Sequence, residues 1–131
     1  SPYAAYKKQS VTTMTPIEIV IKLYSETERE LNRSIVFIEE KNYESANNAL
    51  SKSVDLIAAL RSVLDVSLPI GKNLDAIYDF LEKQIITANV KKDMEIVKSL
   101  LPMVAELKDA FTQIGAMSKD EIAAQSLQAS K

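Results

Sequence analysis

Three alternating glutamates, Glu26, Glu28 and Glu30, form the densest group of side chains that could act as acids, bases or metal ligands. They fall in a segment expected to be helical, where residues two positions apart point in different directions, so they cannot share one site. The chain contains no histidine and no cysteine, and it therefore lacks the commonest general base and a thiolate nucleophile. Metal sites in helical bundles usually combine histidine with carboxylates. We therefore expect a protein that is not an enzyme and needs no cofactor or metal.

The charged residues also argue against binding to nucleic acid and against insertion into a membrane. The formal net charge is −2, so no broad basic surface for phosphate groups is expected. The lysine pairs Lys7–Lys8 and Lys91–Lys92 are isolated and most simply face solvent. The longest uncharged stretches, such as residues 9–17, are far shorter than the roughly 20 residues that cross a bilayer. The absence of cysteine fits a reducing compartment such as the cytoplasm.

Four amphipathic stretches predict the elements that must carry any site. Residues 15–18 (Thr-Pro-Ile-Glu) indicate a helix start, because threonine and glutamate form a capping box and proline suits the first helical position. Further residues typical of helix ends are Asn42, Asp93 and Gly115. Apolar residues at three- and four-residue steps predict helices over about 16–40, 43–65, 69–89 and 93–115. Four such helices joined by short links predict an all-α, antiparallel four-helix bundle.

The two ends of the chain and one proline are expected to depart from an ideal bundle. Residues 1–117 form the predicted single domain, which opens with a short helical or extended segment before the first long helix. Pro102 lies inside the fourth stretch, where it removes one helical hydrogen bond, so a kink is expected there. Residues 118–131 contain few large apolar side chains, which predicts a loosely attached tail that is a short helix or disordered.

The helices carry more apolar residues than a single core stripe requires. The first helix has six within eight positions, and the third and fourth helices add others beside their main stripes; these residues are Ile17, Ile19, Val20, Ile21, Leu23, Tyr24, Tyr78, Phe80, Val97, Leu101 and Met103. Two interpretations are open. These additional apolar residues form either the subunit interface of a self-associating structural bundle or an apolar groove for the amphipathic segment of a partner.

Several sequence blocks resemble the FliS family of flagellin export chaperones. The first blocks are Tyr-Ala-Ala-Tyr at residues 3–6, Val-Thr-Thr-Met-Thr-Pro-Ile-Glu-Ile at 11–19 and Leu-Tyr at 23–24. Three later blocks follow in the order and spacing of the family, at residues 73–80 (Asn-Leu-Asp-Ala-Ile-Tyr-Asp-Phe), 88–93 (Ala-Asn-Val-Lys-Lys-Asp) and 107–111 (Leu-Lys-Asp-Ala-Phe). Together the blocks extend from residue 3 to about residue 114.

The resemblance implies a helical-bundle protein of the bacterial cytoplasm that captures newly made flagellin before export. Members of the family bind the disordered C-terminal segment of flagellin, partly as helices in apolar grooves, and so prevent premature polymerisation. The resemblance also implies delivery of this client for flagellar type III secretion, with a component of the export gate as a further partner. It implies no cofactor, and the free protein is expected to be a monomer or a weak homodimer.

The resemblance further assigns candidate flagellin-binding residues, which are aromatic, aliphatic and amide side chains in or directly beside the matching blocks. The amides, Asn73 and Asn89, can bond the client backbone or fix helix ends. The full set is Tyr3, Tyr6, Val11, Val20, Tyr24, Asn73, Ile77, Tyr78, Leu81 and Asn89.

The tyrosines of this set each have two possible roles. The two N-terminal tyrosines match family residues that cover or border the client groove, and they can equally cap one end of the bundle. Tyr24 offers a hydroxyl at a groove edge or belongs to the core. In the third-helix block we expect Tyr78 to contact the client, while Ile77 and Leu81 are expected in the core.

Overall fold

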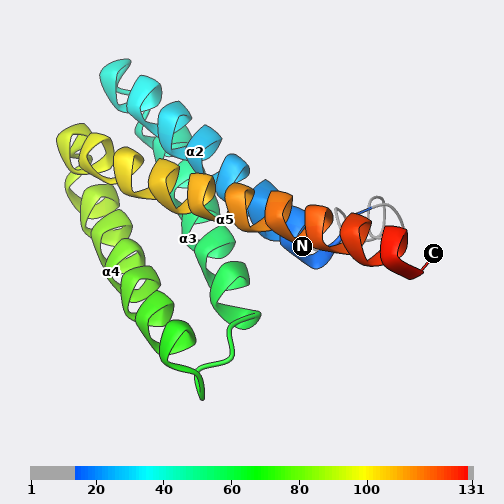
Figure 1. The fold of residues 1–131 in the computed structure, drawn as a ribbon. Coiled ribbons are helices and arrows are strands. Elements are labelled where there is room, and N and C mark those ends of the chain that lie inside the picture. Colours follow the sequence, from blue (N-terminus) through cyan, green and yellow to red (C-terminus); the bar gives the residue numbers. More distant parts are fainter. Residues whose placement is uncertain (1–13, 130–131) are drawn as a thin grey trace.

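The computed structural model describes the backbone of residues 14–129 and the side chains of residues 14–117. This part of the chain forms four helices: α2 (Pro16–Glu39), α3 (Tyr43–Ser62), α4 (Pro69–Lys91) and α5 (Met94–Ala129). No strand occurs among the described residues. Successive helices run in opposite directions and pack against one another (Figure 1), which confirms the predicted all-α bundle. The expectations for Tyr3, Tyr6 and Val11 lie outside the described residues.

The predicted caps begin the helices. Thr15 Oγ1 accepts a hydrogen bond of 3.3 Å from the amide of Glu18 at the start of α2, and Pro16 occupies the first turn. At the start of α3, Asn42 Oδ1 accepts from the amide of Ser45 at 3.3 Å. Such bonds satisfy amides that have no partner inside the helix. These local signals therefore place α2 and α3 within a residue of their predicted starts.

Two lysines adopt the left-handed backbone conformation where α2 and α4 end. Lys41 has φ 59° and Lys92 has φ 53°, values that favour glycine. After α4, the amide of Asp93 donates to the carbonyl of Ala88 at 3.0 Å. The ammonium of Lys92 also donates to the carbonyl oxygen of Asn89 at 2.6 Å and to its side-chain oxygen at 2.7 Å. These bonds offset part of the strain at Lys92.

Helix α5 is longer than the sequence predicts. It continues past Pro102 and Gly115, the two residues expected to kink it or to end it. It continues through Pro102 without a break, and because this proline is exposed, the helix loses a hydrogen bond on its solvent side. The predicted helix end at Gly115 is wrong, since Gly115 has no positive φ and is buried against α2. A Cβ atom at Gly115 would lie 3.6 Å from Ile17 and 3.7 Å from Ile21. Gly115 thus serves close helix packing rather than termination.

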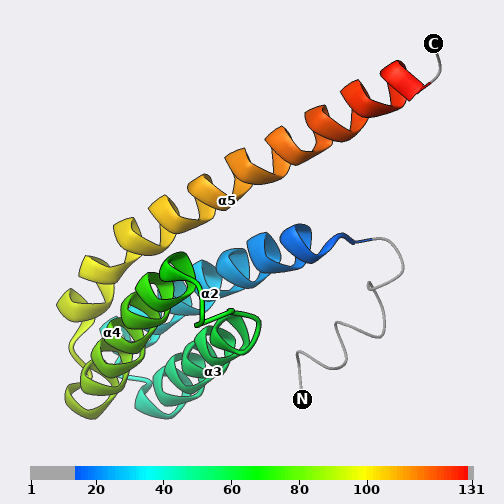
Figure 2. The same ribbon diagram turned by 60° about the horizontal axis from the view of Figure 1, so that its bottom comes forward.

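The C-terminal part of α5 extends past the other helices. Residues 118–129 continue the same helix instead of forming the predicted separate helix or disordered tail (Figure 2). None of the helices in the described part of the chain combines the length and hydropathy needed to cross a membrane.

The core lies between the four helices, but they do not pack equally. Its fully buried large aliphatic side chains include Leu31, Leu50, Ile57, Leu60, Leu81, Ile85, Val97 and Val104. Helix α5 packs mainly on α2, and α4 packs mainly on α3. Helices α4 and α5 meet at their shared turn and diverge from it (Figures 1 and 2). They form a wedge whose wide end holds the apolar groove described below.

Candidate functional site

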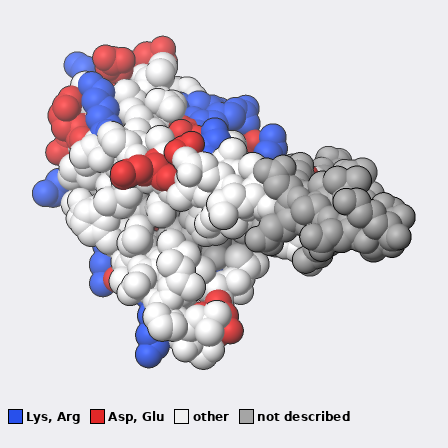
Figure 3. All heavy atoms as spheres, viewed as in Figure 1, with Lys and Arg blue, Asp and Glu red and all other residues white. Residues whose placement is uncertain are grey.

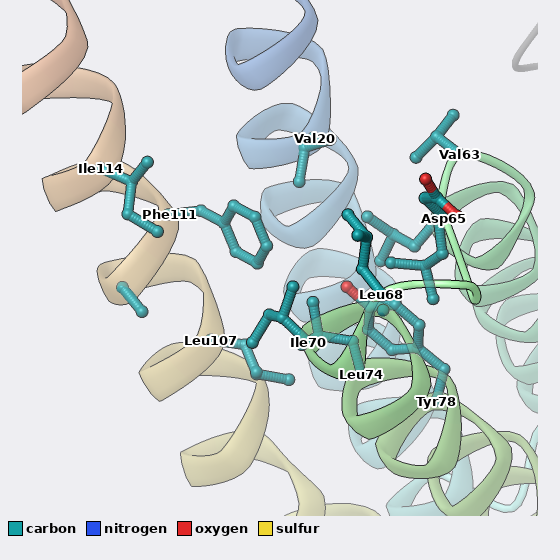
Figure 4. Close-up of a pocket in the computed structure, with 14 residues that line it drawn as sticks. Val20, Val63, Asp65, Leu68, Ile70, Leu74, Tyr78, Leu107, Phe111 and Ile114 are labelled. Carbon is teal, nitrogen blue, oxygen red and sulfur yellow. The ribbon is translucent and has the colours of Figure 1, made fainter.

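An apolar groove of about 470 Å³ occupies the wide end of the wedge between α4 and α5 (Figure 4). Five parts of the chain supply its walls: α2, the end of α3, the α3–α4 connection, the first half of α4 and the middle of α5. The lining residues are Val20, Leu60, Val63, Leu64, Asp65, Leu68, Ile70, Gly71, Leu74, Tyr78, Leu107, Ala110, Phe111 and Ile114. Asp65 is the single charged residue among them, so the groove suits an apolar ligand.

The rim of the groove holds large apolar side chains in water. Leu68 is 51% exposed, Ile70 63% and Ile114 48%. In Figure 3 most charged side chains on this side of the molecule lie in its upper half and along its left and lower edges, and the area below the central acidic cluster is largely uncharged. Exposed apolar side chains clustered around a concave surface are typical of a site that binds another protein segment.

The floor of the groove contains a buried pair of tyrosines from different helices. Tyr78 of α4 lines the groove, and its hydroxyl is hydrogen-bonded to the hydroxyl of Tyr24 on α2. The Tyr24 ring contacts the ring of Phe111 on α5, with centroids 5.5 Å apart and planes inclined by 32°. Burial raises the pKa of both tyrosines, and the hydrogen bond raises that of Tyr24 further. Both are therefore neutral hydroxyls across the physiological range.

One wall of the groove is a short connection folded back against the first turn of α4. Gly71 lies so close to this connection that a Cβ atom would be 1.8 Å from the carbonyl oxygen of Asp65. That same oxygen accepts from the amide of Leu68 at 3.2 Å. The Asp65 carboxylate accepts from the amide of Ser67 at 3.0 Å, and its hydrogen bonds with Ser67 lower the pKa of Asp65. Gly71 thus allows the turn that presents Leu68 to the groove.

Arg61 holds the end of α3 to α4 beside this wall. Its guanidinium donates to Asp75 at 2.8 Å and to Glu82 at 3.2 Å, and it lies 3.5 Å from Asp79. One arginine thus contacts three carboxylates spaced along one face of α4. The pKa of Arg61 is raised, first by the hydrogen bond to Asp75. The arrangement fixes the spacing of α3 and α4 at the groove.

The structure brings only some of the predicted site residues together. Val20 and Tyr78 line the groove, and Tyr24 lies directly behind Tyr78. In the third-helix block the burial is the reverse of the expected order, because Tyr78 is buried and Ile77 is only half-buried. Leu81 is buried in the core as expected.

The two amide candidates of α4 do not line the groove. Asn73 is exposed, and it does not line the groove. The side-chain nitrogen of Asn89 donates to Asn47 Oδ1 of α3 at 2.8 Å. Asn89 thus joins the ends of two helices, which is the structural role considered for it from the sequence.

Sequence reasoning missed most of the α3–α4 connection and the contribution of α5. Connection residues have no helical period, so they carry no amphipathic signal. The sequence feature that indicates a binding role for this connection is its composition. Residues 66–71 (Val-Ser-Leu-Pro-Ile-Gly) are unusually apolar for an exposed link. On α5, Leu107 and Phe111 belong to a matching sequence block, but nothing in their spacing distinguishes a residue facing the groove from a core residue.

The three alternating glutamates do not form a site. They have separate cationic partners: Lys22 and Arg29 for Glu26, Lys108 for Glu28, and Arg33 and Lys52 for Glu30. Glu30 is only 1% exposed, and its carboxylate is 3.0 Å from Arg33 and 3.5 Å from Lys52. Among the residues that the structure describes, no group of three acidic side chains is placed to hold a metal ion.

Comparisons with known proteins agree on one family. The family model described as "Flagellar protein FliS" matches residues 1–118. The flagellar secretion chaperone FliS of Vibrio cholerae is 34% identical over 116 residues, covering 84% of this chain and 85% of that protein. FliS of Bacillus subtilis is 28% identical over 113 residues, covering 86% and 85%.

A solved structure supports the fold independently. The crystal structure of a bacterial flagellar chaperone matches with a TM-score of 0.72 at 18% sequence identity, covering 90% of this chain and 96% of the other. The bundle described above is therefore the fold of that chaperone. With most of its length matched by the family model and by a relative at 34% identity, this chain belongs to the FliS family of flagellar secretion chaperones.

Proposed function

We propose that this protein binds the C-terminal segment of flagellin in the groove between α4 and α5, before flagellin is exported. Bound there, the segment cannot polymerise, and the complex delivers flagellin for flagellar type III secretion. The observation that carries the proposal is the apolar groove with its exposed rim residues Leu68, Ile70 and Ile114, in a chain of the flagellar chaperone family.

The physical properties of the groove suit this task. A segment that polymerises as a helix presents an apolar stripe, which can bury itself between the walls of the wedge. Burial of apolar surface contributes about 25 cal/mol per Å², from which the entropic cost of association is subtracted. Ordering a disordered segment costs several kcal/mol, so the complex remains releasable. No step requires a bond to be made or broken, in line with a chaperone rather than an enzyme.

Within this proposal, Val20 and Tyr78 contact the client directly and Tyr24 supports Tyr78 from behind. Exposed Asn73 and half-buried Ile77 lie in the same turns of α4 as the lining residues Leu74 and Tyr78 but outside the groove lining, and their contacts with the client rest on the family resemblance. Leu81 contributes as part of the core beneath. Three further contacts and one amide rest on the family resemblance alone: Tyr3, Tyr6, Val11 and Asn89. The protein acts in the bacterial cytoplasm, with the export gate as its next partner.

Titration calorimetry with a peptide of about 40 residues from the C-terminus of the same organism's flagellin tests the proposal. We expect saturation at one peptide per chain, with a large negative heat-capacity change. Ile70→Ser should weaken binding about tenfold, because Ile70 is an apolar rim residue. Val90→Ser is the matched control, since Val90 is 81% exposed at the opposite end of α4.

Two results would count against the proposal. An absence of heat at several temperatures, together with a concentration-independent oligomer by light scattering, would favour a self-associating structural bundle. Equal weakening by Ile70→Ser and Val90→Ser would place the client somewhere other than the groove.

A further inference from the structure

Asp65 brings one negative charge to a groove whose other lining residues carry none. Its side chain is exposed and lies at the groove edge beside Val63, across the groove from α5 (Figure 4). Other acidic side chains near this wall are already paired, since Asp75 and Glu82 accept hydrogen bonds from Arg61. By contrast, none of the described cations forms an ion pair with Asp65.

The local backbone holds the Asp65 carboxylate in place and keeps it ionised. One oxygen, Oδ1, accepts hydrogen bonds from the amide of Ser67 at 3.0 Å and from the Ser67 hydroxyl at 2.5 Å. These bonds lower the pKa of Asp65, so the side chain is charged at neutral pH. The other oxygen, Oδ2, has no hydrogen-bond partner among the described residues. An oriented, charged acceptor is thus available at the groove edge before a client binds.

We infer that Asp65 forms an ion pair with a lysine or arginine of the bound client, and that this pair fixes the register of the client in the groove. The inference rests on the proposed function and identifies the client residue by its charge. Apolar contacts are non-directional, so a segment can slide or reverse in an apolar groove at modest cost. A single charge at one edge removes this ambiguity, because only one placement of the client brings its cation to Asp65.

The same carboxylate selects against acidic clients. An acidic side chain placed beside Asp65 would be repelled, and no cation of the described groove lining offsets that repulsion. Because Asp65 is exposed to water, the ion pair is worth only about 2- to 5-fold in affinity. The apolar walls supply most of the affinity, and Asp65 supplies specificity and orientation.

Calorimetry of the full chain with the C-terminal flagellin peptide tests this assignment. In a series of peptides, each Lys and Arg is replaced in turn by Gln. One replacement should weaken binding to the wild-type chain by about 2- to 5-fold and leave binding to Asp65→Asn unchanged. Asparagine can still accept the bonds from Ser67, so this variant removes the charge and keeps the turn. Thermal melts by circular dichroism verify that the variant is folded.

Asp55→Asn is the matched control variant. Asp55 is exposed on α3 and does not line the groove, so the variant makes the same change in net charge elsewhere. It should bind every peptide as the wild-type chain does. Raising the salt concentration from about 50 mM to about 500 mM should weaken the wild-type complex more than the Asp65→Asn complex, because salt screens an exposed ion pair.

A further peptide tests the register. Moving the coupled basic residue to the opposite end of the apolar stripe should weaken binding to the wild-type chain as much as replacing it by Gln does. Equal binding before and after the move would contradict a fixed register.

The possible failures are distinguishable. If the wild-type chain does not bind the unmodified peptide, the proposed function fails and this inference fails with it. If the peptide binds but no basic replacement is coupled to Asp65→Asn, only the inference is overturned. The same coupling in Asp55→Asn and Asp65→Asn would also overturn it, since net charge rather than a pair at position 65 would then act on the client.

Discussion

The carbonyl oxygen of Asp65 occupies the space in which a side chain at Gly71 would begin, only 1.8 Å from the ideal Cβ position. The oxygen belongs to the backbone and the backbone also fixes the Cβ position, so no side-chain rotation can relieve the contact. The connection that forms one wall of the groove can therefore fold back on α4 only if position 71 is glycine. This contact couples a single residue to the shape of the groove.

The first prediction compares the two glycines of the chain. Gly71→Ala should displace the α3–α4 connection, lower the free energy of unfolding by about 2 kcal/mol and weaken binding of the flagellin peptide. Gly115→Ala places its methyl 3.6 Å from Ile17, an ordinary contact, and alanine favours a helix interior by about 0.5–1 kcal/mol. Urea unfolding should thus give opposite signs for the two variants. A similar loss in both would show that Gly71 is not specially constrained.

The second prediction concerns the left-handed lysines. Lys41→Gly should raise the free energy of unfolding by about 1 kcal/mol, because glycine adopts a φ of 59° without strain. Lys41→Ala keeps the strain and should give no gain. Lys92→Gly should gain less, since it also loses the ammonium bonds to Asn89. Equal gains at positions 41 and 92, measured by urea unfolding, would show that the bonds to Asn89 contribute nothing.

The third prediction concerns alkaline pH. Burial raises the pKa of Tyr24 and Tyr78 above their ordinary value near 10, so the native state keeps protons that the unfolded chain releases. The stabilisation is complete below pH 10 and is lost as the pH rises above it. The slope is at most about 1.4 kcal/mol per pH unit for each tyrosine.

Urea unfolding at pH 9 and pH 11 measures this loss. The variant with both Tyr24→Phe and Tyr78→Phe should show a flatter dependence than the wild type, because phenylalanine does not ionise. An equally steep fall in that variant would assign the alkaline instability to other groups.

The fourth prediction concerns the proline inside α5. Because Pro102 is exposed and the helix continues through it, Pro102→Ala should restore a backbone hydrogen bond without disturbing the core. The expected gain is about 1–3 kcal/mol in the free energy of unfolding. A loss of stability would mean that the proline sets a curvature of α5 on which its packing against α2 depends.

Sequence patterns sufficed where a feature is local and periodic. The caps at Thr15 and Asn42, and the burial of Leu81, follow from spacing within one helix. The role of Gly115 could not be predicted, because a glycine that ends a helix and one that lets two helices approach look alike in the sequence. Only its contact with Ile17 on another helix distinguishes them.

The candidate site was predictable in part for a similar reason. Adjacent helical positions such as Ile77 and Tyr78 point about 100° apart, so their relative burial depends on where the neighbouring helices lie. Here Tyr78 reaches Tyr24 on α2, while Ile77 is only half-buried. The connection residue Leu68 joins the groove through a backbone turn that has no periodic signature.

The most direct test of the central claim is site-specific photo-crosslinking to full-length flagellin. A benzophenone amino acid is placed in the groove at Ile70, or outside it at Val90 as the control position. We predict strong crosslinks from position 70, mapped by mass spectrometry to the C-terminal segment of flagellin, and weak ones from position 90. A complex that forms normally but crosslinks from position 90 and not from position 70 would contradict the assignment of the groove as the client site.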